Sequence, residues 1–395
     1  MRTIADAWQS SDPRRVAYVR AVAAIAYIFV AGWLGATLLP RWRHWGAGVP
    51  HATGLDLTSL DGLFVRWDAG YYWTIATMGY GVDLDARAFF PGYPFLVRAV
   101  TALTGCSLFT AGGLISVTCF VGAGALLHHW VRQDHGDDLA RRATVLFQFS
   151  PLSFFYVAFY AESLFIFLAL LGLVLARSGR FALSGVAIAA AGATRPQAFL
   201  LAIPYVVEFW LQRPWTRAAW TQFAGGALVA PLGTLAYVRF LSEADRPFVE
   251  PYFILLQKSW ATHLTWPWVT LIDGLSAAVH GKGIAPVWFS RVYATHDLLY
   301  ALAGLALTCW AARRLRPSAA AYLLGGVALF YVTHGPYGHS FDSFPRHLLS
   351  IAPVYVAGAL FVGELSPRIR AIVLWAGGLQ LGFLSAWFAS GRWVS

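Results

Sequence analysis

The sequence predicts an all-α polytopic membrane protein, a class in which most of the chain crosses the lipid bilayer as helices. Of its 395 residues, 58% are hydrophobic and only 12% are charged, and the mean hydropathy is +0.57. Apolar runs long enough to cross a bilayer recur along the chain, and the arginines are scattered in the short segments between them. We therefore interpret the net charge of +10 as a signal for membrane orientation, and we expect no nucleic-acid partner.

The apolar runs set the number of expected helices. The first, 21–39, follows Arg14, Arg15 and Arg20 and predicts an uncleaved first helix. Further runs lie at 107–130, 142–177, 181–211, 218–241, 296–312, 318–334, 347–364 and 371–390.

Two of these runs, 142–177 and 181–211, exceed one crossing, and each contains polar residues near its middle. We expect both to fold as hairpins of short helices that turn at 160–163 and at 194–197, with Pro196 starting a helix. The total is then about eleven transmembrane helices.

The arginines predict the orientation of these helices. Basic residues mark cytoplasmic ends, so the N-terminus is expected in the cytoplasm of a multi-pass plasma-membrane protein. The whole chain, 1–395, is expected to form a single membrane domain with a large first external loop, 40–106, and a second external loop, 242–295. In this arrangement, 90–104 lies along the outer interface as a helix, and the turns at Glu162 and Arg195 face the same side as the loops.

The first loop contains the most informative segment, 66–94, which surrounds Asp68 with aromatic and small residues. A carboxylate beside aromatic rings at a membrane surface can hold a sugar and deprotonate a hydroxyl group. The alternative is that Asp68 only caps a short interfacial helix, because aspartate is a favoured N-cap.

Glu162 and Arg195 are ionisable residues within apolar runs, where charge is costly and usually functional. They could instead form a structural ion pair that joins the two hairpin turns. Arg195 could also bind a phosphate group, or its side chain could extend to the membrane interface.

The segment 333–347 holds three histidines, one aspartate and one arginine. Its spacing fits no compact metal-ligand motif, so no metal site is predicted, although a divalent cation is conceivable. Contacts of Arg346 and His347 with a phosphate group are the preferred interpretation.

Four motifs then carry a resemblance to a known family. RWDAGYYWTIATMGY, AFFPGYP, SPLSFFYVAFYAESLF and TRPQAFLL occur in this order, and the sequence resembles the PIG-V family of membrane mannosyltransferases, which has relatives in actinobacteria. The resemblance is strongest from Leu63 to Ile203 and weaker at 343–347. It implies a GT-C glycosyltransferase fold whose first external loop carries interfacial helices and the catalytic aspartate. It also implies a polyprenyl-phosphate-mannose donor.

Carried onto this sequence, the resemblance makes Asp68 the catalytic base. Arg195, Arg346 and His347 are expected at the donor phosphate, with Glu162 in support. Further supporting or substrate-binding residues are expected at Arg66, Trp67, Tyr71, Tyr72 and Tyr93. The expected reaction inverts the anomeric centre and forms an α-mannoside on the outer face. The segment 82–87 and the loop 242–295 carry no family motif.

The partners that follow are the lipid-linked donor, a glycolipid or lipoglycan acceptor, and membrane lipid, and no cofactor is certain. The same fold could transfer another sugar, such as arabinose, or use a protein hydroxyl as acceptor. A secondary transporter or lipid flippase would instead show ionisable residues at the midplane and inverted repeats, which the sequence lacks. An inactive scaffold is the third alternative.

Overall fold

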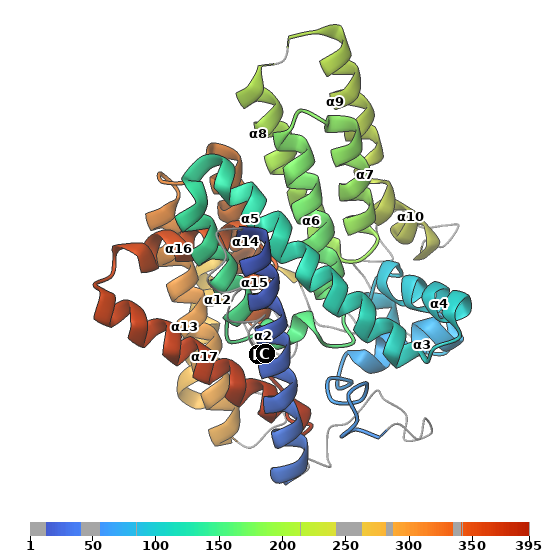
Figure 1. Ribbon diagram of the computed structural model, residues 1–395, viewed down its shortest axis with the longest axis vertical. Helices are drawn as coiled ribbons and strands as arrows, with labels where there is room; N and C mark the ends of the chain where they lie inside the picture. The colour runs from blue at the N-terminus through green and yellow to red at the C-terminus, as the bar shows by residue number, and fades with distance from the viewer. Residues whose placement is uncertain are drawn as a thin grey trace.

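Helices make up most of the described residues in a computed structural model that describes residues 13–40, 56–83, 85–213, 215–241, 263–281, 287–334, 341 and 343–394. Figure 1 shows their arrangement, with α6 to α9 gathered in one bundle and α3 and α4 beside it. The helices are α2 (Pro13–Leu38), α3 (Ala69–Met78), α4 (Gly92–Thr104), α5 (Leu108–Phe149), α6 (Glu162–Arg177), α7 (Phe181–Gly192), α8 (Ala202–Gln212), α9 (Arg217–Val229), α10 (Leu232–Leu241), α12 (Pro267–His280), α13 (Val287–Ala311), α14 (Pro317–Val332), α15 (Phe344–Leu349), α16 (Pro353–Glu364) and α17 (Pro367–Ala389). The described residues also form the short 3-10 helices η2 (Asp85–Ala88), η3 (Ser153–Tyr156) and η4 (Pro196–Leu201), and the two-residue strands β1 (His263–Leu264) and β2 (Thr333–His334) pair antiparallel.

The all-α membrane class is confirmed. Five helical stretches within the described residues are long and apolar enough to cross a membrane: 18–38, 108–149, 217–241, 290–311 and 367–389. Three shorter apolar helices, α7, α14 and α16, have 10–17 residues. The expected count of about eleven spans therefore stays a prediction, because several crossings would need short helices placed in series.

Both predicted hairpin turns are present. The helix α6 begins at Glu162, within the first expected turn. The helix α7 ends at Gly192, and η4 begins at Pro196. Proline suits this first helical position because the missing N–H would have no intrahelical partner there.

The sequence separates two apolar runs by charged residues at 131–141, and the structure breaks the helix within this segment. The stretch labelled α5 consists of two helices that meet at Gly136, whose φ of 78° and ψ of 178° are non-helical. Glycine adopts this backbone without a steric penalty. Both helices extend further into the charged segment than the apolar runs do.

The two expected external loops contain helices. Within 40–106 lie α3, η2 and α4, and the 13 residues of α4 are too few to cross a bilayer. Within 242–295 lie α12 and the first residues of α13, so that the long helix begins earlier than the expected 296.

The core is aromatic around η3, which runs through the interior of the protein. Phe154, Phe155 and Tyr156 are all at most 2% exposed. The Tyr156 hydroxyl donates to Leu349 O at 2.7 Å and lies 2.8 Å from the Tyr355 hydroxyl. This contact fixes η3 against α15 and α16, so the core holds together two regions that carry candidate site residues.

The first loop is tied to the Arg195 turn through Gly92, the first residue of α4. Its N–H donates to Ala193 O at 2.6 Å. A Cβ atom added to Gly92 would lie 2.6 Å from the same oxygen and 2.9 Å from Thr194 Cγ2. Only glycine permits this close approach of the two backbones.

Gly92→Ala is therefore expected to destabilise the protein by about 1–3 kcal/mol, the usual cost of overpacking. The measurement is the midpoint of thermal unfolding in detergent. Gly113→Ala in α5 is the control, because nothing lies within 4 Å of its added Cβ and alanine favours a helix. Equal midpoints for the two variants would contradict the close approach at Gly92.

Candidate functional site

The candidate site is a chain of alternating charges centred on Arg346. Its guanidinium donates from Nη1 to Asp68 Oδ2 at 2.7 Å and from Nε to Glu162 Oε1 at 2.5 Å, while Nη2 forms an ion pair with the same Glu162 oxygen. The guanidinium carbon also lies 4.7 Å from the ring centres of Phe155 and Tyr160. Arg346 therefore joins two carboxylates from distant parts of the sequence over an aromatic surface.

Arg195 extends the chain from Glu162 to His347. Arg195 Nη1 lies 2.6 Å from Glu162 Oε1, and Nη2 lies 3.1 Å from His347 Nδ1. Gln197 Nε2 is 3.4 Å from the same histidine nitrogen, and the imidazole stacks on Phe330 with ring centres 5.3 Å apart. The ion pair between the two hairpin turns is therefore present, and it forms one part of a larger network.

The four charged side chains of this network differ in exposure. The Glu162 side chain is 1% exposed, those of Arg346 and Arg195 are 7% and 8% exposed, and that of Asp68 is 14% exposed. Two carboxylates and two guanidinium groups balance in charge, as groups buried this deeply require. Asp68 is thus the most exposed of these four charged side chains.

Residues in unusual backbone conformations precede both Asp68 and Arg346. Trp67 has a φ of 52° and Ser343, the N-cap of α15, has a φ of 58°. Side chains other than glycine, asparagine or aspartate seldom adopt this left-handed region, and such strain is typical of functional sites.

Asp68 occupies the N-cap position of α3, as the capping alternative requires, but its side chain makes no capping hydrogen bond. The carboxylate contacts Arg346 instead. A capping role therefore does not account for this residue.

Tyr160, which is not among the predicted site residues, holds the Asp68 backbone in place. Its hydroxyl donates to Arg66 O at 2.9 Å and accepts from the Asp68 N–H at 3.2 Å, while its ring lies under Arg346. The sequence signal that could have identified Tyr160 as a site residue is its position two residues before Glu162.

Arg66 binds backbone carbonyl groups. It donates to the oxygens of Gly62, Val65, Leu57 and Ala389, at 2.7–3.2 Å. These contacts fix the loop before Asp68 against the end of α17 and support the site from outside the charged network.

The aromatic residues selected from the sequence pack around the site. Trp67 meets Trp393 edge to face at 5.0 Å, and Tyr71 stacks on Phe89 at 4.6 Å. Tyr72 and Tyr93 are 3% and 0% exposed and meet edge to face at 5.3 Å. The Tyr93 hydroxyl donates to Gly112 O at 3.1 Å. These buried positions support the loop that carries Asp68.

Burial acts on the two basic residues of α15, which lies outside the long apolar helices. Burial opposes the charge of Arg346, but Glu162 and Asp68 raise its pKa well above the usual value. Burial, together with the charges of Arg195 and Arg346, lowers the pKa of His347 well below 6.5. A neutral His347 accepts at Nδ1 from Arg195 and carries its proton on Nε2.

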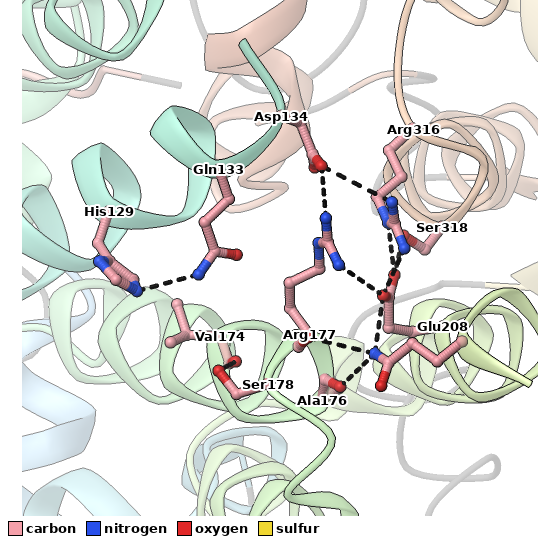
Figure 2. Close-up of polar contacts among 11 residues, drawn as sticks. His129, Gln133, Asp134, Val174, Ala176, Arg177, Ser178, Glu208, Arg316 and Ser318 are labelled. Carbon is pink, nitrogen blue, oxygen red and sulfur yellow. Dashed lines mark hydrogen bonds and ion pairs between the residues drawn. The ribbon is translucent and has the colours of Figure 1, made fainter. Parts of the chain in front are cut away.

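A second polar cluster lies at the other end of α6, around Glu208 of α8 (Figure 2). Glu208 accepts from Arg316 at 2.8 and 2.9 Å, from Ser318 at 2.8 Å and from Gln212 at 2.9 Å. Arg177 donates to Asp134 at 2.8 Å. Both Glu208 oxygens are satisfied by protein groups, so this cluster is a structural connection between α5, α6, α8 and the start of α14.

Among the described residues, no group of three or more histidine, cysteine, aspartate or glutamate side chains could hold a metal ion. His339 and Asp342 of the segment considered for a metal lie outside the described residues.

The comparison with protein families confirms the resemblance found in the sequence. Residues 55–222 match the family described as Mannosyltransferase (PIG-V). The matched segment includes Asp68, Glu162 and Arg195. No curated protein matches the chain.

Solved structures show the fold. The chain is similar to ArnT from Cupriavidus metallidurans bound to undecaprenyl phosphate, with 14% identity, a TM-score of 0.50, and coverage of 89% of this chain and 62% of that chain. The apo state of the same protein matches with a TM-score of 0.49, 14% identity, and coverage of 89% and 61%. The chain thus spans less than two thirds of the length of ArnT, and the likeness shows a GT-C fold.

Glu162→Gln removes one of two carboxylates that compensate two buried guanidinium groups. We expect the free energy of unfolding to fall by about 3–5 kcal/mol, as for other broken buried ion pairs. Thermal unfolding in detergent measures it.

Glu364→Gln is the matched control, because Glu364 pairs with Arg314 at 3.8 Å with both side chains exposed. An exposed pair contributes less than about 1 kcal/mol. Equal losses in the two variants would contradict the buried network.

The lowered pKa of His347 predicts a pH dependence of stability. Above pH 6.5 His347 is neutral in both states, whereas below it the unfolded chain binds a proton that the folded protein excludes. Stability should therefore fall with pH below 6.5, by up to about 1.4 kcal/mol per pH unit. His347→Gln should show a shallower fall between pH 6.5 and 5 in thermal unfolding. Parallel curves for the two proteins would contradict a neutral buried His347.

Proposed function

We propose that this chain, whose residues 55–222 match the PIG-V mannosyltransferase family, transfers mannose from polyprenyl-phosphate-mannose to a glycolipid or lipoglycan hydroxyl group. The observation that carries the proposal is the bridge from Arg346 to both Asp68 and Glu162, with Asp68 at its more exposed end. It combines a base with a phosphate-binding group in one site.

Asp68 is the proposed general base. A carboxylate can accept the proton of the acceptor hydroxyl when it lies within hydrogen-bond reach. The Asp68 Oδ2 atom accepts a hydrogen bond from Arg346 Nη1 at 2.7 Å, so this oxygen is occupied. It becomes available to the acceptor hydroxyl once Arg346 binds another anion.

The phosphate of the donor is that anion. The Nη1 group of Arg346 can exchange Asp68 for a phosphate oxygen. Glu162 meanwhile continues to hold the Nε and Nη2 groups of Arg346. Arg195 provides a second guanidinium, and the Nε2–H of His347 provides a neutral donor. Phosphate binding would thus position the donor and release the base in one step.

The charges then balance during transfer. The acceptor oxygen forms a bond to C1 of mannose, the bond from C1 to the phosphate oxygen breaks, and the phosphate leaves with the electron pair. Asp68 takes the hydroxyl proton, so the network gains one positive charge as the leaving phosphate gains one negative charge.

The arrangement supports inversion. A double displacement needs a second carboxylate as nucleophile. Glu162 is 1% exposed, and its Oε1 is held by both arginines, which makes it a poor nucleophile. A β-linked donor would therefore yield an α-mannoside.

The donor and location are proposed from the fold and the sequence together. The similar ArnT structure contains undecaprenyl phosphate, which supports a polyprenyl-phosphate carrier for this chain. The arginine distribution supports a plasma-membrane protein with a cytoplasmic N-terminus and the Asp68 site on the outer face.

The test is mannose transfer by purified protein from polyprenyl-phosphate-mannose to membrane glycolipids. Asp68→Asn keeps the shape of the side chain but removes its basicity, so transfer should fall by about 10²–10⁴-fold. The thermal unfolding midpoint should show that the variant remains folded.

Asp85→Asn is the control, because Asp85 is an exposed aspartate of the same loop. It should transfer mannose at the wild-type rate. Full activity of Asp68→Asn would exclude Asp68 as the base. Transfer from polyprenyl-phosphate-arabinose but not from the mannose donor would exclude the proposed sugar.

A further inference from the structure

A groove separate from the Asp68 site runs between α2, α5, α16 and α17. Its larger part is an apolar cavity of about 800 Å³. We call this part the apolar groove; it is lined among others by Tyr27, Leu146, Val354 and Leu374. This volume lies within the range of about 300–1,000 Å³ that is usual for sites of small ligands.

The apolar groove continues into a smaller, charged cavity of about 340 Å³, which we call the basic pocket. The two share Val145, Leu146 and Leu374. The charged residues that line the basic pocket are Arg20, Asp138, Arg141, Arg142 and Arg370. Arginines therefore outnumber carboxylates in this lining.

Two of these arginines, Arg142 and Arg370, keep their charge within the described part of the chain. Asp138 pairs with Arg141 only. Arg370 donates to the carbonyl oxygens of Val362, Gly363 and Leu365, at 2.8–3.0 Å, and these groups carry no net charge. No carboxylate among the described residues pairs with Arg142.

The basic pocket and the apolar groove follow each other in the same order along α2 and along α17. On α2, Arg20 lies in the basic pocket and Tyr27 in the apolar groove. On α17, Arg370 lies in the basic pocket, and 373–380 line the apolar groove. A ligand that fits both parts has an anionic end and a long apolar portion parallel to the membrane-spanning helices.

The basic pocket lies far from the Asp68 site. Ala389, at the end of α17, accepts from Arg66 at 2.7 Å beside the Asp68 loop. From Arg370 to Ala389 the helix is about 28 Å long at 1.5 Å per residue, close to the thickness of a hydrocarbon core. The basic pocket and the Asp68 site therefore lie at opposite ends of α17, about one hydrocarbon thickness apart.

We propose that this groove binds an anionic phospholipid of the leaflet opposite to the Asp68 site, with its phosphate in the basic pocket and an acyl chain in the apolar groove. Basic pockets between transmembrane helices at a membrane surface have the chemistry to hold lipid phosphates. The lipid would also brace α2 against α17, which meet where the Tyr27 hydroxyl donates to Gly378 O at 2.9 Å.

The test is lipid binding to delipidated full-length protein in neutral detergent, followed by native mass spectrometry. Dioleoyl-phosphatidylglycerol should bind at a saturable site, and dioleoyl-phosphatidylcholine should bind much more weakly. Equal affinity for the two lipids would overturn the proposal. Inorganic phosphate and glycerophosphoglycerol, which lack acyl chains, should not displace the lipid at millimolar concentration. Displacement by either would show a headgroup site alone and would also overturn it.

Arg141→Gln with Arg142→Gln should weaken phosphatidylglycerol binding by roughly 25-fold, because each basic residue near a membrane surface contributes about a fivefold factor. Arg213→Gln with Arg217→Gln is the matched control. Its two arginines lie at the α8–α9 connection, at the same end of the helices but outside the groove lining. Wild-type affinity for phosphatidylglycerol in the variant with Arg141→Gln and Arg142→Gln would contradict the proposal.

Leu374→Trp fills the junction of the two cavities without a change of charge. It should reduce phosphatidylglycerol binding at least as strongly as the arginine pair. It therefore tests the groove even if the arginine variant fails to fold, and unchanged binding in Leu374→Trp would exclude the apolar groove as the site of the acyl chain.

Discussion

The structure depends on the compensation of one buried charge. Glu162 is 1% exposed at the start of α6, where an isolated carboxylate would cost several kcal/mol. Arg195 from the neighbouring hairpin and Arg346 from α15 both reach its Oε1. Arg346 also binds Asp68. Formation of the charged network therefore brings together three distant parts of the chain, and the fold and the site are completed by the same contacts.

The polar clusters around Glu208 and Glu162 differ in how completely their carboxylate oxygens are hydrogen-bonded. Around Glu208, both carboxylate oxygens accept hydrogen bonds from protein groups, and the cluster has no capacity for a ligand (Figure 2). Around Glu162, the Oε2 atom is buried without a hydrogen-bond partner in the described residues, and Asp68 remains partly exposed. An unsatisfied, partly exposed network can exchange partners when a substrate enters. The helix α6 joins the two clusters, because it begins at Glu162 and ends at Arg177, which pairs with Glu208.

The sequence predicted the features that depend on local chemistry. Polar residues inside apolar runs located the turns at Glu162 and Arg195, and the cost of burying charge predicted that these two residues could pair. Other features depend on long-range contacts or on backbone geometry. The bond from Arg346 to Asp68 joins residues 278 positions apart, and the left-handed Trp67 and Ser343 have no signal in residue type. The helix break at Gly136 falls within the charged segment that separates two predicted spans, whereas the extension of both helices into that segment has no signal in hydropathy.

The most direct test of the central claim is an experimental structure with a non-hydrolysable polyprenyl-phosphonate-mannose bound. The account predicts that Arg346 releases Asp68 and binds the phosphonate while it keeps Glu162, and that the Asp68 carboxylate then faces C1 of the sugar. A phosphonate bound elsewhere, with the contact between Arg346 and Asp68 intact, would contradict it.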